Sequence, residues 1–245
     1  MKNNVDLVEL ASGYWKSFAI GTAMELNIFS ELADHEQDTD SLAKSLQCAP
    51  QHLEALLCSL VGMGLLEKKN NLFFLHPEQR MYLDPSSPDN MLGAFAFNQD
   101  LAGLWMQLPD CVHKGQPVIP DNPHLGEDPA RTRRFVEGMH SRAGLMARNL
   151  LPCLTPESGS KILDVGGGPG TFSIKLAERD PSLEITVLDL PPVVTAAAEI
   201  HSGKSALRSI TFQGGDYHQC AYPGDQDYIL YCGALHQETD TDLNA

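Results

Sequence analysis

The chain has 245 residues, 42% of them hydrophobic, and a formal net charge of −15 at pH 7. The length and the hydrophobic content indicate one or two folded domains rather than a disordered chain, and no apolar run is long enough to span a membrane. The negative charge disfavours duplex nucleic acid as a partner, because binding it requires neutralising its phosphates.

The first part of the chain carries the signals of helices followed by a hairpin. Apolar side chains recur at helical spacing in three segments, which are residues 5–33, 39–46 and 50–63. Asn70 and Asn71 separate two apolar runs and predict the turn of a hairpin over residues 65–75. Three helices and a hairpin predict a winged-helix domain over residues 1–90.

A winged helix suggests DNA binding, but the composition of this one argues against it. The segment that would be the recognition helix, residues 51–63, contains no Lys or Arg, although phosphate contacts and guanine readout both need them. Its apolar helices predict a subunit interface instead.

Residues 91–157 are interpreted as a helical connector. They begin with an aromatic-rich segment that includes Trp105, continue through a stretch rich in Pro, Asn and Asp, and end in a helical pattern that includes Met139. A cluster of Lys and Arg between Arg131 and Arg148 is interpreted as a solvated helix face.

The most informative segment is residues 161–172, KILDVGGGPGTF. An apolar run ending in Asp164 leads into a glycine loop and a helical pattern, and a second apolar run ends in Asp189. This order predicts the first half of a nucleotide-binding α/β unit, with Asp189 placed to accept from a ribose diol.

The details of the loop favour S-adenosyl-L-methionine (SAM) over NAD. The dinucleotide fingerprint requires a sixth-position glycine, and counting from Gly166 that position is Thr171. A carboxylate beside the loop, Asp164, suits a cationic ligand and would oppose a pyrophosphate. SAM carries a sulfonium and an ammonium but no phosphate. The alternatives are an NAD-dependent oxidoreductase, or glycines that serve only a tight turn.

Two later segments extend the same unit. A third strand is predicted to end in Gly214-Gly215-Asp216-Tyr217, where Asp216 could accept from an adenine amino group and Tyr217 could stack on the ring. The alternative is that this segment is only a turn. The apolar run 227–236 predicts a buried parallel strand that delivers His236 to the ligand-binding edge of the sheet.

These motifs resemble those of SAM-dependent O-methyltransferases that join a winged-helix dimerisation domain to a Rossmann-like domain, as in plant phenolic, acetylserotonin and bacterial polyketide O-methyltransferases. The resemblance implies a class I methyltransferase fold, SAM as cofactor, a homodimer, a small-molecule acceptor walled by Trp105 and Met139, and His236 as general base. From the motifs and the resemblance together, the candidate donor-binding residues are Asp164, Gly166, Gly168, Gly170, Asp189, Leu190, Gly215, Asp216 and Tyr217.

The chain departs from the family pattern around the expected base. The family usually continues His-Asp-Trp, whereas here the sequence is His236-Gln237-Glu238. Before the histidine the family often has Lys-Trp or Ser-Arg, and here it has Cys232-Gly233. These changes affect the expected contacts to the methionine end of the donor.

The family's sheet has seven strands, so residues 158–245 are expected to form a Rossmann-like domain that is incomplete after the fourth strand, either by natural truncation or as part of a longer gene. Two functions follow as hypotheses. The first is methyl transfer to a hydroxyl of a small aromatic or polyketide-like molecule. The second is a catalytically inactive homologue that dimerises through its winged helix.

Cysteine usage and the start of the chain predict the compartment. The six cysteines are scattered, without a Cys-x-x-Cys pair, and the first residues do not resemble a secretory signal. We therefore expect reduced thiols in the cytoplasm and no structural metal.

Overall fold

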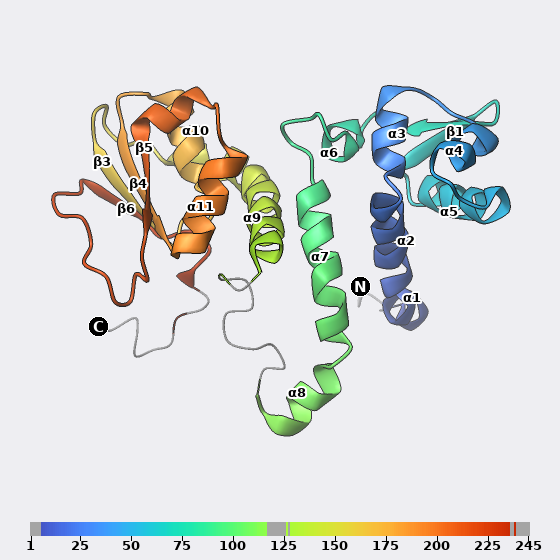
Figure 1. The fold of residues 1–245 in the computed structure, drawn as a ribbon, viewed down its shortest axis with the longest axis horizontal. Coiled ribbons are helices and arrows are strands. Elements are labelled where there is room, and N and C mark those ends of the chain that lie inside the picture. The colour runs from blue at the N-terminus through green and yellow to red at the C-terminus, as the bar shows by residue number, and fades with distance from the viewer. Residues whose placement is uncertain (1–5, 117–125, 127, 236–237, 239–245) are drawn as a thin grey trace, which may run out of the picture. The chain divides into compact units, whose positions relative to one another are not determined.

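The computed structural model describes residues 6–116, 126, 128–235 and 238, and the chain divides into two compact units, residues 1–107 and 108–245 (Figure 1). The sequence-based division at residues 90 and 157 stays a prediction. Among the described residues, no helix combines the length and the apolar character that crossing a bilayer requires.

The first unit is a set of helices with one hairpin. Its elements are α1 Leu7–Ser12, α2 Tyr14–Glu25, α3 Ile28–Asp34, α4 Thr39–Ser45, α5 Pro50–Gly62, β1 Leu66–Lys69, β2 Leu72–Leu75, α6 Arg80–Leu83 and α7 Leu92–Trp105. Between the antiparallel strands, Asn70 and Asn71 have φ values of 50° and 65°. Two successive positive φ values are typical of a type I′ turn, as the sequence predicts.

The first helical segment is broken twice, although its sequence pattern is continuous. Gly13 separates α1 from α2, and Asn27 separates α2 from α3. Asn27 has a left-handed backbone, with φ at 59°, which cannot continue a right-handed helix. The helical spacing of apolar residues along the sequence does not predict such a break.

The core of the first unit forms where α5 packs on α2, α4 and strand β1 of the hairpin. Leu53, Leu57 and Leu60 are spaced by four and three residues, so they share one face of α5. They lie in one buried cluster with Phe29 and Phe73, each at most 3% exposed.

The second unit is an α/β layer structure. Its elements are α8 Leu108–Lys114, α9 Pro129–Leu150, the 3₁₀ helix η1 Leu151–Cys153, β3 Lys161–Val165, α10 Thr171–Arg179, β4 Glu184–Asp189, α11 Pro191–Ile200, the 3₁₀ helix η2 Ser205–Ser209, β5 Ile210–Gly214 and β6 Tyr228–Leu230. The four strands are all parallel and lie in the order β5-β4-β3-β6. This confirms the predicted Rossmann-like arrangement.

Alternate residues of β3 serve opposite faces of this sheet. Ile162 packs with Ile174 of α10, whereas Leu163 and Val165 pack with Tyr217 on the other face. Successive side chains of a strand point to opposite faces of the sheet, so neighbouring residues of β3 pack on different faces. Because the strands are parallel, their carboxyl ends meet at one edge, and the loops there carry the motifs found in the sequence.

The expectation of a buried fourth strand is wrong for the described residues. β6 has only three residues, of which Tyr228 is 40% and Ile229 is 67% exposed. In the described part of the sheet β6 pairs only with β3, so one edge of β6 is open. An apolar run becomes buried only when both faces and both edges are covered.

Candidate methyl-donor site

The loop after β3 requires glycine at several positions. Gly166, Gly168 and Gly170 have φ values of 61°, 54° and 66°, which side-chain-bearing residues rarely adopt. A Cβ on Gly166 would lie 2.9 Å from the Cβ of Ala234. The loop therefore turns in a left-handed conformation and in close contact with the segment that follows β6.

Asp189, at the end of β4, holds this loop. Its Oδ2 accepts from the Gly168 amide at 2.7 Å, and its Oδ1 accepts from the Leu190 amide at 2.7 Å. Each carboxylate oxygen has a second lone pair, so further donors can bind it. Burial raises the pKa of Asp189 above its ordinary value.

Asp164 lies beneath the loop. It is 1% exposed, and its Oδ2 accepts from the Ser173 hydroxyl at 2.6 Å. Burial raises its pKa to about 6, with a smaller contribution from the negative charge of Asp189. The two acids thus repel each other across the loop, a local field that favours a nearby positive charge.

The turn after β5 joins the same edge of the sheet. The Gly215 amide donates to the Asp189 carbonyl at 2.9 Å. The Asp216 carboxylate accepts from the His218 amide at 3.0 Å and from the Gln219 side chain at 2.7 Å. These bonds are those of a side-chain-stabilised turn, and the adenine contact predicted for Asp216 stays a prediction.

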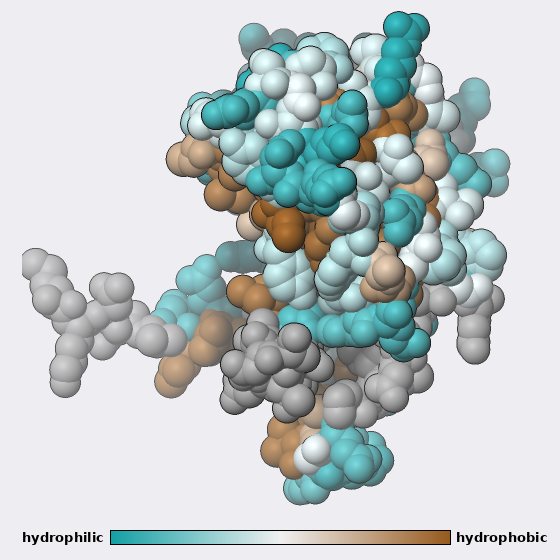
Figure 2. All heavy atoms as spheres, turned by 90° about the vertical axis from the view of Figure 1, so that its left-hand side faces the viewer, coloured by the Kyte–Doolittle hydropathy of each residue, from teal (hydrophilic) through white to brown (hydrophobic). Residues whose placement is uncertain are grey.

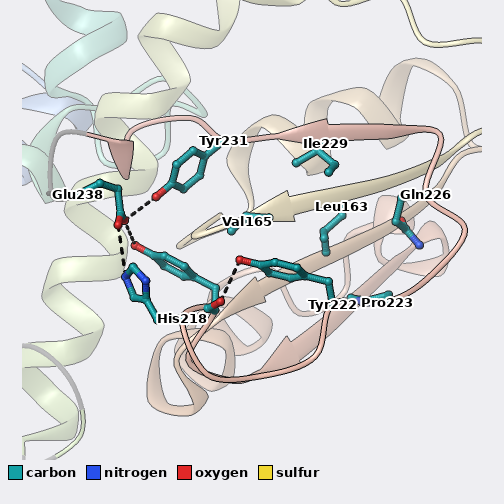
Figure 3. A pocket seen from close by; sticks show the side chains of 10 residues that line it. Leu163, Val165, His218, Tyr222, Pro223, Gln226, Ile229, Tyr231 and Glu238 are labelled. Carbon is teal, nitrogen blue, oxygen red and sulfur yellow. Dashed lines mark hydrogen bonds and ion pairs between the residues drawn. The ribbon is translucent and has the colours of Figure 1, made fainter. Parts of the chain in front are cut away.

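Sequence reasoning missed the contacts of Glu238. The hydroxyls of Tyr217 and Tyr231 both donate to its Oε1, at 2.7 and 2.5 Å, and His218 Nε2 lies 3.5 Å from its Oε2 (Figure 3). Burial and this carboxylate raise the pKa of Tyr217. Tyr217 lies 21 positions and Tyr231 seven positions before Glu238, and the only sequence signal at this place is an acid where the family usually has tryptophan.

These tyrosines line a cavity of about 490 Å³ on the face of the sheet that Leu163 and Val165 occupy. The cavity is lined by Leu163, Val165, Tyr217, His218, Tyr222, Pro223, Gln226, Ile229, Tyr231 and Glu238. Figure 2 views the molecule from the left-hand side of Figure 1 and shows apolar surface between hydrophilic side chains.

The described structure does not test the roles of the three remaining candidate residues. His236 lies outside the described residues. Trp105 ends α7 of the first unit and is 68% exposed, whereas Met139 is half-buried on α9 of the second. The roles predicted for these three residues stay predictions.

Two histidines behind the glycine loop were also missed by sequence reasoning. His201 Nε2 lies 3.0 Å from the Pro169 carbonyl oxygen, and His140 Nδ1 lies 2.8 Å from the Thr171 hydroxyl. Burial lowers the pKa of His140 to about 3 and that of His201 to about 4. One histidine on α9 and one just after α11, 61 positions apart, leave no local pattern.

The pH dependence of stability should show these shifts. Unfolded imidazoles bind protons near pH 6.5, so the contribution of the two histidines is present above that pH and is lost as the pH falls toward 4. Asp164 opposes this change. Its buried negative charge destabilises the folded state, and protonation below pH 6 removes that destabilisation. Between pH 7 and 5 we expect these three groups to lower the free energy of unfolding by about 2 kcal/mol, measured by urea titration.

The matched variant carries glutamine in place of both histidines. It keeps polar side chains at the two positions but removes the imidazoles, so Asp164 alone remains of the three groups and the free energy of unfolding should rise slightly from pH 7 to pH 5. An equal loss in the double variant and in the parent would contradict the assignment. Lys175 and Lys204, whose positive charges oppose protonation of His140, remain in both proteins.

Comparison with known proteins defines the class. The profile of the O-methyltransferase domain matches residues 105–245, and that of the O-methyltransferase dimerisation domain matches residues 8–84. The chain belongs to the O-methyltransferase family.

Individual relatives agree with this assignment. The chain is 29% identical over 234 residues to 3-hydroxy-5-methyl-1-naphthoate 3-O-methyltransferase of Streptomyces sahachiroi, covering 94% of this chain and 68% of the relative. It is 27% identical to acetylserotonin O-methyltransferase of Gallus gallus, covering 91% and 69%. The crystal structure of human N-acetylserotonin methyltransferase in complex with SAM has the same fold, with a TM-score of 0.83 at 23% identity over 99% of this chain and 75% of that one. The chain thus spans about two thirds of the length of these curated relatives.

Proposed function

We propose that this chain binds SAM at the loop after β3 and serves the transfer of its methyl group to a hydroxyl of a small aromatic or polyketide-like molecule. The observation that carries the proposal is the loop itself. Three glycines with positive φ lie between two acids, the buried Asp164 and the half-buried Asp189, in a chain of the O-methyltransferase family.

The chemistry of these residues fits SAM better than a dinucleotide. When bound, SAM supplies a methyl group on a positively charged sulfur that an oxygen nucleophile can accept. Asp164 and Asp189 provide negative charge beside the loop and would repel a pyrophosphate. Asp189 also keeps free lone pairs for a ribose diol, and the small residues leave room for close approach.

His236 is proposed as the general base and Trp105 and Met139 as walls of the acceptor pocket. A phenol has a pKa near 10, so removal of its proton at neutral pH needs a base, and imidazole has a suitable pKa. General-base help accelerates such steps by about a hundred- to ten-thousandfold.

Calorimetric titration tests the donor site directly. We expect one molecule of S-adenosylhomocysteine (SAH) to bind per chain and NAD not to bind. A His236→Ala variant should retain SAH binding and lose about a hundredfold or more in methylation rate. The control is His113→Ala, on the exposed surface of α8, which should leave both unchanged. Absence of SAH binding by the parent would contradict the proposal.

The second candidate is a non-catalytic protein that dimerises. The exposed apolar strand β6 favours it, because such an edge weakens the half of the chain that carries the donor site. On this hypothesis the chain forms dimers but gives no heat with SAH.

We also propose that the chain is a homodimer formed through its first unit. α1 and α2 expose six large apolar side chains, between 50% and 77% exposed: Leu7, Val8, Leu10, Tyr14, Trp15 and Phe18. Apolar surface gathered on neighbouring helices is typical of an interface.

Replacing Phe18 with aspartate should weaken this dimer. A buried charge at an interface position costs about 2 kcal/mol or more, which is roughly a thirtyfold rise in dissociation constant. Sedimentation equilibrium should show the shift toward monomer. Lys16→Ala is the control on α2, because its exposed ion pair with Glu9 contributes little. A Phe18→Asp variant that stays as dimeric as the parent would rule out this surface.

A further inference from the structure

The glycine loop is attached to the second unit through a buried histidine. His201 follows α11, is 1% exposed, and lies with Nε2 3.0 Å from the carbonyl oxygen of Pro169. A carbonyl oxygen only accepts, so Nε2 must carry the proton and donate it. This bond fixes the backbone of the loop just before Gly170.

A second histidine fixes the backbone just after Gly170. His140 of α9 lies with Nδ1 2.8 Å from the hydroxyl of Thr171, which is the first residue of α10 and is 1% exposed. The two imidazole rings pack edge to face, with centroids 4.6 Å apart. The pair therefore spans Gly170, whose φ of 66° marks the point where the loop becomes a helix.

We propose that His140 and His201 are positioning residues that hold the glycine loop and the first turn of α10 ready for the methyl donor. This inference rests on the proposed function, because it assigns the loop to donor binding. Glycine-rich segments lose much conformational freedom on ordering. A loop that two side chains already hold in place loses less conformational entropy when the methyl donor binds, so its affinity for the donor is higher.

The polarity of the pair distinguishes this role from core packing. Two apolar side chains could fill the same volume without a polar atom. Within the described residues, however, Nδ1 of His201 is buried and has no hydrogen-bond partner, which is unfavourable. Nevertheless, His201 Nε2 faces the Pro169 carbonyl oxygen of the loop, and His140 Nδ1 faces the hydroxyl of Thr171, one residue beyond Gly170.

The test uses paired variants of each histidine. His201→Gln retains a donor near the position of Nε2, and His201→Leu removes it. His140→Asn retains a polar group near Nδ1, and His140→Leu removes it. We expect each leucine variant to weaken SAH binding about tenfold, and each amide variant to restore most of it. In turnover assays the leucine variants should raise the KM for SAM and leave kcat nearly unchanged.

A core variant separates positioning from loss of stability. Val136 is fully buried on α9, four residues before His140, and Val136→Ala should lower the melting temperature while keeping SAH affinity within about twofold of the parent. Leucine variants that bind SAH as tightly as the parent would overturn the inference.

Hydrogen exchange of residues 166–171 in the ligand-free protein measures how firmly the loop is held without any ligand. It therefore tests this inference separately from the proposed function. If the parent binds no SAH, the proposed function fails, and the exchange still decides the inference. Faster exchange in the leucine variants, restored in the amide variants, supports positioning. Equal exchange in all of them overturns it.

Discussion

Replacing Asp164 with asparagine should stabilise the ligand-free protein at pH 8 and weaken its binding of SAM. The buried carboxyl has a pKa of about 6, against 3.8 for an exposed aspartate, so its ionisation opposes folding at neutral pH. This difference corresponds to roughly 3 kcal/mol, part of which the asparagine loses because its amide needs an acceptor. We expect a net gain of about 1 to 2 kcal/mol in urea unfolding.

The same substitution should lower SAM affinity about tenfold, because a cationic ligand loses a nearby negative charge. Binding of SAH should fall less, since SAH lacks the sulfonium charge. Calorimetry with both ligands measures the difference. The linkage has a defined sign: SAM should bind more tightly as the pH rises through 6, and this rise should be absent from Asp164→Asn.

Ser173→Ala is the matched control for this prediction. It removes the hydroxyl that donates to Asp164 at 2.6 Å but leaves the carboxyl in place. It should destabilise the protein by about 1 to 3 kcal/mol and retain the preference for SAM over SAH. If Asp164→Asn loses stability and retains SAM affinity, then the carboxylate contributes to folding rather than to ligand binding.

The elements that the sequence predicted well are those with a local physical cause. Two adjacent asparagines adopt positive φ more readily than most residues, so Asn70 and Asn71 located the hairpin turn. The glycine spacing after Asp164 likewise reports backbone conformation, and the structure gives positive φ to Gly166, Gly168 and Gly170.

Most of the features that the sequence did not predict depend on contacts between distant segments. The break at Asn27 is local, a left-handed residue that apolar periodicity does not reveal, whereas the exposure of Ile229 follows from the open edge of the described sheet. The bonds from His140 to Thr171 and from Tyr217 to Glu238 join residues 31 and 21 positions apart. No local pattern specifies such pairs, although they determine how the loop and the neighbouring cavity are held.

Gly166→Ala is expected to have the largest effect on both stability and donor binding. The new side chain would have to adopt a left-handed backbone at φ 61°, and its Cβ would lie 2.9 Å from the Cβ of Ala234. Backbone strain costs about 1 to 2 kcal/mol and overpacking about 1 to 3 kcal/mol, so we expect about 3 kcal/mol in all. Relief of the contact would also shift the glycine loop against the segment after β6, so SAH binding should fall with stability.

Two further variants separate these contributions. Gly159 has φ at 81° and no atom within 4 Å of an added Cβ, so Gly159→Ala should cost only the strain, about 1 kcal/mol, and retain SAH binding. Ala234→Gly in the Gly166→Ala protein restores the space but not the backbone freedom, so it should recover about half of the lost stability. Full recovery would show that the left-handed conformation of Gly166 costs little. No recovery would show that the loop and the segment after β6 do not constrain each other.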